Sequence, residues 1–327
     1  MAATFPDRFE SRPAEEGDLD HVVDLVEAAD RALGVAPEPF REDLIWTWHL
    51  PTTDLVRDTR IVLKGDAVAA YGEAIWKHPE EGGPLYLFVA VRPEQQRVGM
   101  DTWLMSWGEA LAQERGSEGV RMHVVDRNVP GHDLLRSRGY VQVRSSFTMC
   151  KSLEPDEASG TVPSGVTIRP YTDADERVLF EVHEASFADH WGFRPTSFES
   201  FNEELHGEDW DPSLVSLAEA NEATVGHVVA FLFEACGYVA SLGVVKDWRG
   251  RGIAKALLRR SFADLASRGM REVRLSVDAQ NPHGAVALYE GVGMAVCRRY
   301  DIFDLGTAEA AGAQAIGSGP QPQPGAP

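Results

Sequence analysis

Two arginines and two glycines alternate at residues 249–252, where an apolar run ends and residues at helical spacing begin. The first N–H groups of a helix have no partner within it, and the aligned peptide dipoles add partial positive charge there. Gly250 and Gly252 carry no side chain that would block the approach of an anion. Positive charge comes from three basic residues, Arg249, Arg251 and Lys255. The pattern predicts a binding loop for a phosphate or diphosphate group.

Other interpretations of this stretch can be compared with that one. The P-loop of nucleotide-binding proteins needs Gly-x4-Gly-Lys-Ser/Thr, which is absent here. The dinucleotide fingerprint Gly-x-Gly-x-x-Gly/Ala needs a small residue where Lys255 stands. A basic, solvated helix start that uses glycine as a connector is the alternative without a ligand. The choice is therefore between a phosphate loop of another kind and a plain helix start.

The residues around the loop predict the elements that position it. Apolar residues recur at helical spacing from Ile253 to Leu265, and Gly269 follows as a C-cap. Strands are predicted at 217–220, 225–233, 238–245, 273–277 and 297–303, and a short helix at 284–290. These elements predict an α/β (α+β) fold, a mixed-sheet sandwich with one long central helix.

The sequence indicates two copies of one such unit. Residues 11–30 are similar to residues 168–187, and two later pairs of stretches match in the same order at offsets near 152–157 residues. Proline, glycine, serine and acidic residues between the halves indicate a linker, and the low-complexity end indicates disorder. The predicted parts are a first domain, 1–150, a linker, 151–165, a second domain, 166–305, and a disordered tail, 306–327.

Composition narrows the function classes. The net charge of −20 argues against a nucleic-acid partner, because neutralisation of phosphates dominates that kind of binding. The N-terminus has no apolar core of a signal peptide, and no apolar run is long enough to span a membrane. Three cysteines, far apart and odd in number, predict neither a disulfide framework nor a zinc ribbon. We expect a cytoplasmic protein with no membrane partner; the sequence does not indicate its oligomeric state.

The loop and its surroundings resemble a known family. Residues 249–254 fit Gln/Arg-x-x-Gly-x-Gly/Ala, the signature of the GCN5-related N-acetyltransferases, and "SLGVV" and "VDAQNPHGAVALYEGVGM" resemble that family's other motifs. The tandem arrangement resembles actinobacterial double-domain acetyltransferases, which include mycothiol synthase. The resemblance implies two tandem GNAT-like domains and acetyl-CoA as acyl donor. It implies these cofactor-binding residues: Leu242, Gly243, Val244, Arg249, Gly250, Arg251, Gly252, Ile253, Ala254, Lys255 and Asn281.

Acetyl transfer to an amine needs a neutral amine, a polarised thioester carbonyl and a proton donor for the departing thiolate. Tyr289 stands where the family carries its general-acid tyrosine. A backbone N–H at Leu242 or Gly243 would polarise the carbonyl, with Gly243 suited to a bulge. Tyr238 occupies the place where relatives carry a base, so Glu234 is the candidate base. Alternatives to Glu234 are Asp189 and His190 on the acceptor side, or a water relay.

No metal site is predicted, because "HEASFADH" (residues 183–190) lacks the His-Glu-x-x-His spacing. The first half keeps Gln96 and Gly99 of the signature but places Arg97 and Asp101 where small residues belong. Leu135 falls near the place that matches Tyr289, so we expect the first domain to be degenerate.

The predicted function is acetyl-CoA-dependent N-acetylation of a primary amine on a small molecule, by direct transfer in the second domain. One alternative is the narrower reaction of mycothiol synthase, acetylation of a cysteinyl amine on a sugar–inositol scaffold. The other is a non-catalytic acyl-CoA sensor or scaffold.

Overall fold

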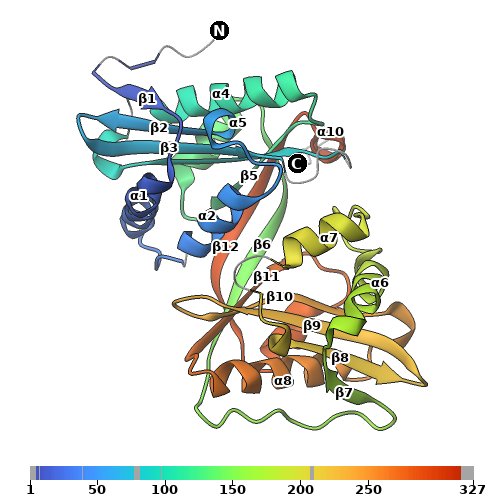
Figure 1. The fold of residues 1–327 in the computed structure, drawn as a ribbon. Helices are drawn as coiled ribbons and strands as arrows, with labels where there is room; N and C mark the ends of the chain where they lie inside the picture. Colours follow the sequence, from blue (N-terminus) through green and yellow to red (C-terminus); the bar gives the residue numbers. More distant parts are fainter. Residues whose placement is uncertain are drawn as a thin grey trace, which may run out of the picture. The chain divides into compact units, whose positions relative to one another are not determined.

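The computed structural model describes residues 5–6, 8–38, 40–76, 82–96, 98–206 and 210–317. The chain forms two compact units (Figure 1). The first unit is Met1–Ser145 with the chain from Tyr300 onward, and the second unit is Ser146–Arg299. These limits differ from the predicted domains, 1–150 and 166–305, because residues 146–152 pair with β11 (Glu272–Asp278) and residues 300–305 pair with β5 (Val120–Val125).

The second unit has a mixed sheet with strands in the order β12-β6-β11-β10-β9-β8-β7, in which β12 is represented by its start and β6 by its end. Its strands are the end of β6 (Val141–Ser152), β7 (Thr167–Pro170), β8 (Val215–Ala220), β9 (Ala223–Leu232), β10 (Gly237–Val244), β11 (Glu272–Asp278) and the start of β12 (Ala295–Leu305). Its helices are α6 (Glu176–Phe187), α7 (Phe198–Leu205), α8 (Ile253–Ser267) and α9 (Ala285–Glu290). The predicted α/β architecture with one long central helix is confirmed.

Two separate apolar clusters show that helices cover both faces of this sheet (Figure 1). Phe262 and Leu265 of α8 pack with Val228 of β9 on one face. Leu179 of α6 packs with Val229, the next residue of β9, on the other. This alternation along β9 is what a strand buried on both faces requires.

The two central strands of the second unit separate along their length. β10 and β11 are parallel and paired only at Gly237↔Val273 and Tyr238↔Arg274. On its other side β10 stays paired with β9, with a bulge between Val239 and Ser241. The sheet therefore opens beyond Tyr238, as predicted for the entry of a cofactor. The bulge lies at Ala240, three residues before the predicted Gly243.

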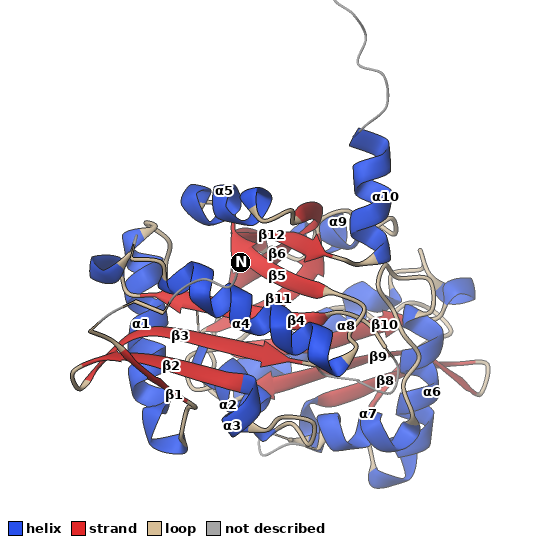
Figure 2. Ribbon diagram, turned by 90° about the horizontal axis from the view of Figure 1, so that it is seen from above, coloured by secondary structure: helices blue, strands red, loops and turns tan. Residues whose placement is uncertain are grey.

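The first unit repeats this plan, with strands in the order β1-β2-β3-β4-β5-β12. Its strands are β1 (Glu10–Arg12), β2 (Thr59–Lys64), β3 (Ala67–Ile75), β4 (Leu85–Val91), β5 (Val120–Val125), the start of β6 and the end of β12. Its helices are α1 (Leu19–Ala32), α2 (Phe40–His49), α3 (Leu55–Asp58), α4 (Met100–Arg115), α5 (Val129–Ser137) and α10 (Ala308–Gly317). β1, β2 and β3 run side by side in Figure 2.

Two further expectations are wrong. The tail was predicted to be disordered from Gly306, but 308–317 form α10, and 318–327 lie outside the described residues. No disulfide was predicted, but Cys150 and Cys297 are bonded within the second unit. Spacing could not indicate this pair, because 147 residues separate the two cysteines in sequence.

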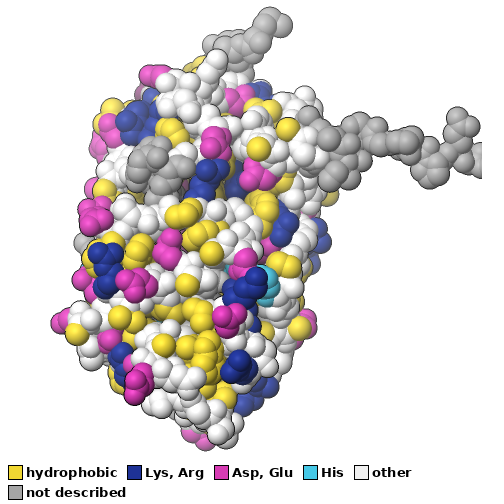
Figure 3. Space-filling view, turned by 90° about the vertical axis from the view of Figure 1, so that its right-hand side faces the viewer, with side chains coloured by type: hydrophobic (Ala, Val, Ile, Leu, Met, Phe, Trp, Pro, Cys, Tyr) yellow, Lys and Arg dark blue, Asp and Glu magenta, His cyan; other side chains and the backbone are white. Residues whose placement is uncertain are grey.

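On the face shown in Figure 3, basic and acidic side chains are interspersed. Among the described helices, none is both long and apolar enough to cross a lipid bilayer.

Candidate functional site

A pocket of about 500 Å³ occupies the opening between β10 and β11 in the second unit. Its walls come from β10, β11, the end of α6, the start of α8 and the short helix α9. All but one of the predicted cofactor-binding residues line it: Leu242, Gly243, Val244, Arg249, Gly250, Gly252, Ile253, Ala254, Lys255 and Asn281. Arg251 is the exception. The fold therefore brings together the residues that the sequence motif had singled out.

The start of α8 presents unpaired N–H groups to this pocket. Gly252 is its N-cap with φ +82°, and Gly250 has φ +74°, so both adopt the left-handed conformation that glycine accepts without strain. Within the described part of the chain, the N–H groups of Arg251, Gly252 and Ile253 donate no hydrogen bond to the protein. These donors, with the helix dipole and the nearby Lys255 side chain, suit an anionic group.

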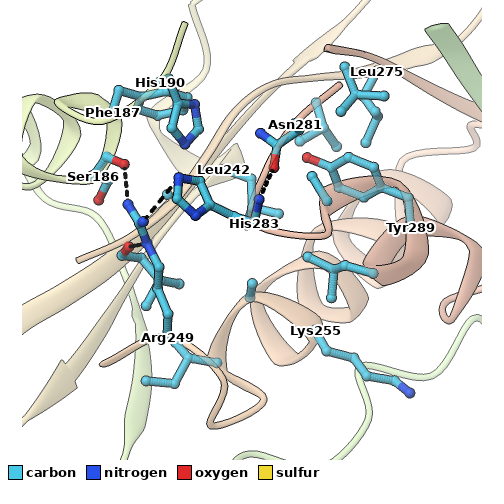
Figure 4. Close-up of a pocket in the computed structure, with 18 of the residues that line it drawn as sticks. Ser186, Phe187, His190, Leu242, Arg249, Lys255, Leu275, Asn281, His283 and Tyr289 are labelled. Carbon is cyan, nitrogen blue, oxygen red and sulfur yellow. Dashed lines mark hydrogen bonds between the residues drawn. The ribbon is translucent and has the colours of Figure 1, made fainter. Parts of the chain in front are cut away.

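Arg249 has a different place from the one its position in the motif predicts. Its guanidinium donates two hydrogen bonds to the carboxylate of Asp189, at 2.7 and 2.9 Å. It also donates to the backbone carbonyls of Ser186 and Val244 (Figure 4). The ion pair lowers the pKa of Asp189 to about 2. Arg249 therefore holds the loop against the end of α6 and is not free to bind a phosphate.

Arg251 also differs from the prediction. Its guanidinium lies 4.4 Å from the centre of the Trp248 ring and donates to the carbonyl of Asp247. Of the three predicted basic groups, only Arg249 makes an ion pair among the described residues, and the Lys255 side chain makes no hydrogen bond there. Figure 4 shows its side chain extending away from Tyr289.

Tyr289, on α9, faces the pocket and is 8% exposed. Burial raises the pKa of its phenol to about 12. No described residue forms a hydrogen bond with its hydroxyl, and Figure 4 shows the oxygen turned toward Asn281. Asn281 uses its side-chain oxygen to accept from the N–H of His283 at 2.9 Å. Tyr289 is thus a protonated, unengaged donor at the pocket wall.

Glu234 is not part of this site. It is exposed in the turn between β9 and β10 and is absent from the pocket wall. The sequence left two positions open for it, facing the cleft or capping the hairpin, and the structure places it in the hairpin turn. The structure therefore does not bring Glu234 into the pocket with Tyr289.

Three polar residues missed by the sequence reasoning meet beside the bulge. Ser241 Oγ lies 2.8 Å from His227 Nε2 and 3.2 Å from His183 Nδ1. Burial lowers the pKa of His183 to about 4, and burial lowers the pKa of the fully buried His227 well below its ordinary value. Both imidazoles are neutral at pH 7. Sequence spacing gave no signal, because the three residues come from α6, β9 and β10.

Asp189, His190 and His283 bring one potential metal-ligand atom each within 4.8 Å of one another. Arg249 already occupies both carboxylate oxygens of Asp189 and lies 3.5 Å from His283 Nε2. A cation bound here would have to displace the guanidinium. We therefore interpret the group as an ion-pair cluster at the pocket wall.

The first unit lacks several of these features. Gly99, the N-cap of α4, has φ +86°, like Gly252, but Asp101 stands in the first turn of the helix. Leu135 is buried in an apolar cluster. β4 and β5 separate beyond Tyr86↔Arg121, but β4 pairs with β3 without a bulge. Arg97 lies outside the described residues.

Comparisons with known proteins agree with this geometry. Residues 179–294 match the model of the Acetyltransferase (GNAT) family. A crystal structure of a GCN5-related N-acetyltransferase from Sphaerobacter thermophilus is 31% identical, with a TM-score of 0.82, over 92% of this chain and 96% of that one.

A mycothiol acetyltransferase from Nocardiopsis dassonvillei is 28% identical over 87% of this chain and 93% of its own length. A tandem GNAT protein from the clavulanic acid biosynthesis pathway has a TM-score of 0.70 at 15% identity, over 91% of this chain and 98% of that one. That last likeness concerns the fold, and it confirms the predicted tandem arrangement.

Proposed function

Because this chain belongs to the GCN5-related N-acetyltransferase family, we propose that its second unit transfers the acetyl group of acetyl-CoA to a primary amine of a small molecule. The enzyme class follows from the family; the donor, the acceptor and the residue roles are the proposal. One observation carries it. A single pocket joins the open N–H groups at the start of α8 to the hydroxyl of Tyr289 through the gap between β10 and β11.

The residues present fit acetyl-CoA. Its diphosphate needs closely spaced N–H donors, which Arg251, Gly252 and Ile253 supply. Its extended arm needs a slot with backbone groups along one side, and β10 beyond Tyr238 has no strand partner on that side. When bound, the thioester supplies an acetyl group already activated for attack by an amine.

The protein's own groups then act on charge and protons. An N–H of β10, at Leu242 or Gly243, faces the open side and stabilises negative charge on the carbonyl oxygen. Tyr289 donates its proton to the sulfur as the carbon–sulfur bond breaks. Since burial raises the pKa of Tyr289 to about 12, it stays protonated through the neutral and mildly alkaline range.

The identity of the acceptor amine is a separate and narrower part of the proposal. The relatives named mycothiol acetyltransferase favour testing a cysteinyl amine on a sugar–inositol scaffold first. Identity near 28% does not carry a substrate from one enzyme to another. A panel that contains this compound, glucosamine, spermidine and tyramine separates the narrow version from a broader amine acetyltransferase.

The test is Tyr289→Phe, measured by thiol release from acetyl-CoA with the best amine of the panel. We expect kcat to fall on the order of 100-fold or more, because the thiolate leaves without its proton donor. The dissociation constant for CoA, from calorimetry, should stay within about twofold. Tyr171→Phe is the matched control, since Tyr171 is 7% exposed in the same unit and outside the pocket wall.

Two results would contradict the proposal. Wild-type protein that binds CoA but releases no thiol with any amine favours the acyl-CoA sensor. A Tyr289→Phe variant with wild-type kcat removes Tyr289 from the reaction.

A further inference from the structure

The reaction needs a group that takes a proton from the acceptor nitrogen, and the predicted one, Glu234, lies elsewhere. Asp189 is a poor substitute because Arg249 occupies both of its carboxylate oxygens. The candidate that remains beside the bulge is the cluster of Ser241, His183 and His227.

The cluster lies directly behind the pocket wall. Ser241 follows the bulge residue Ala240, and both of its neighbours, Ala240 and Leu242, line the pocket. Phe187, another lining residue, stacks on the ring of His183 with centroids 4.7 Å apart. The cluster therefore lies on the α6 side of the pocket. Ser241 stands in sequence between Ala240 and Leu242, the β10 residues that line the pocket.

The hydrogen bonds of the cluster have one favoured direction. His227 is fully buried, and among the described residues its Nδ1 has no partner. A buried N–H without an acceptor costs more than a buried lone pair without a donor, so we assign the proton of His227 to Nε2. Nε2 then donates to Ser241 Oγ, which leaves the Ser241 hydroxyl to donate to His183 Nδ1.

Resting on the proposed function, we propose that Ser241 and His183 form the proton relay of the reaction, with His227 as its positioning residue. As the nitrogen bonds to the acetyl carbon, its proton passes to Ser241 Oγ and the Ser241 proton passes to His183 Nδ1. The carbon–sulfur bond breaks and the sulfur takes the proton of Tyr289. His183, which is partly exposed, then releases its proton to solvent. Tyr289 regains a proton from solvent.

A weak base is sufficient for this step. Burial lowers the pKa of His183 to about 4, so it cannot deprotonate an alkylammonium near pKa 10. The amine must therefore bind in its neutral form. Once its lone pair bonds to the acetyl carbon, its N–H becomes far more acidic, and a neutral imidazole behind a hydroxyl accepts the proton.

The test compares Ser241→Ala with Ser241→Thr, which keeps a hydroxyl. Steady-state rates are measured with acetyl-CoA and the best amine of the panel, and CoA binding is measured by calorimetry. We expect Ser241→Ala to lower kcat on the order of 100-fold with KM for acetyl-CoA and CoA affinity unchanged, and Ser241→Thr to recover most of the rate. Ser261→Ala, a buried serine of α8 outside the pocket wall, should match wild type.

His183→Phe gives an independent reading because it leaves β10 intact. It should lose as much kcat as Ser241→Ala, and the double variant should lose little more, since both remove one relay. Wild-type kcat in either single variant that still binds CoA overturns the relay. If Ser241→Ala no longer binds CoA, His183→Phe alone decides.

Failure of the two proposals can be distinguished. Wild-type protein inactive on every amine overturns the proposed function and the relay with it. An active wild type whose Ser241 and His183 variants are equally active, but whose His190→Gln variant is not, overturns the relay alone and assigns the proton to His190.

Discussion

Glu73 is a buried carboxylic acid on β3 of the first unit, and its hydrogen-bond partners among the described residues are neutral side chains. Its Oε2 accepts hydrogen bonds from Tyr71 at 2.7 Å, and from Trp48 and Thr47 at 3.2 Å. Burial raises its pKa to about 7, because removing the charged form from water outweighs these neutral donors. The folded first unit therefore holds a proton near neutral pH that the unfolded chain gives up.

This predicts how stability depends on pH. Between the unfolded pKa of 4.5 and about 7 the folded state binds more protons than the unfolded state, so the free energy of unfolding falls as pH rises. Glu73→Gln should remove that fall, and flatten the change between pH 5 and pH 8 by about 3 kcal/mol. Urea unfolding of both proteins at the two pH values measures it. The exposed Glu94→Gln is the control, and equal slopes in all three proteins would contradict the prediction.

For single residues, the sequence indicated which residues line the pocket better than it indicated which side chains they contact. Gly252, Tyr289 and Asn281 line one pocket, because the spacing of a motif specifies backbone position. Arg249 was misjudged because its partner, Asp189, lies 60 positions away. Ser241 was missed because a serine in an apolar strand carries no signal until the fold sets two imidazoles beside it.

Among the elements, α4 and α8 begin with the same local geometry but different chemistry. Gly99 and Gly252 are both left-handed N-caps, with φ +86° and +82°. A Cβ on Gly99 would meet no atom within 4 Å, and one on Gly252 would meet only Pro163 at 3.7 Å. Alanine at either site should therefore cost a similar stability, about 1 kcal/mol, from backbone strain alone.

CoA affinity should separate the two substitutions. Gly252→Ala shifts the N–H groups that we assign to the diphosphate, so affinity for CoA should fall at least about tenfold. Gly99→Ala should leave it unchanged, since Asp101 adds like charge at the start of α4. Calorimetry with CoA and thermal unfolding of both variants give the comparison. Weakened binding in Gly99→Ala would show that the first unit holds CoA.

Hydrophobic periodicity predicted the order of the helices and strands, but it did not predict the position of the bulge in β10. Gly243 was the predicted bulge because glycine tolerates irregular backbone. In the structure a Cβ there would lie 2.5 Å from His227 and 2.6 Å from Ser186, so this glycine serves close packing against α6 instead. The bulge falls at Ala240, where register against β9 shifts and no side chain marks it.

For the whole molecule, the sequence predicted two repeats but not where each sheet ends. Residues 146–152 pair with β11, and residues 300–305 pair with β5. A linear repeat pattern assigns each last strand to the half that precedes it, because pairing partners are invisible in a single sequence. The first unit is therefore completed by residues from the end of the chain.

An ion pair makes that completion testable. Arg121 of β5 donates to both oxygens of Asp304 of β12, at 2.8 and 2.7 Å, and their side chains are 6% and 0% exposed. Asp304→Asn leaves a buried guanidinium without its counter-charge, which costs about 3–5 kcal/mol. Glu27→Gln, which breaks the exposed Arg31–Glu27 pair of α1, should change stability by less than about 1 kcal/mol.

Removing both charges should restore the stability that Asp304→Asn loses. The loss of stability should also be confined to the first unit. Arg121→Met with Asp304→Leu puts apolar groups in place of the pair, and such replacements are often neutral. Hydrogen exchange followed by mass spectrometry should show faster exchange in β5 of Asp304→Asn and near wild-type exchange in the double variant. CoA affinity should stay unchanged, because the pocket lies wholly in the second unit. Protection of β5 equal to wild type in Asp304→Asn would mean that residues 300–305 do not complete the first unit's sheet.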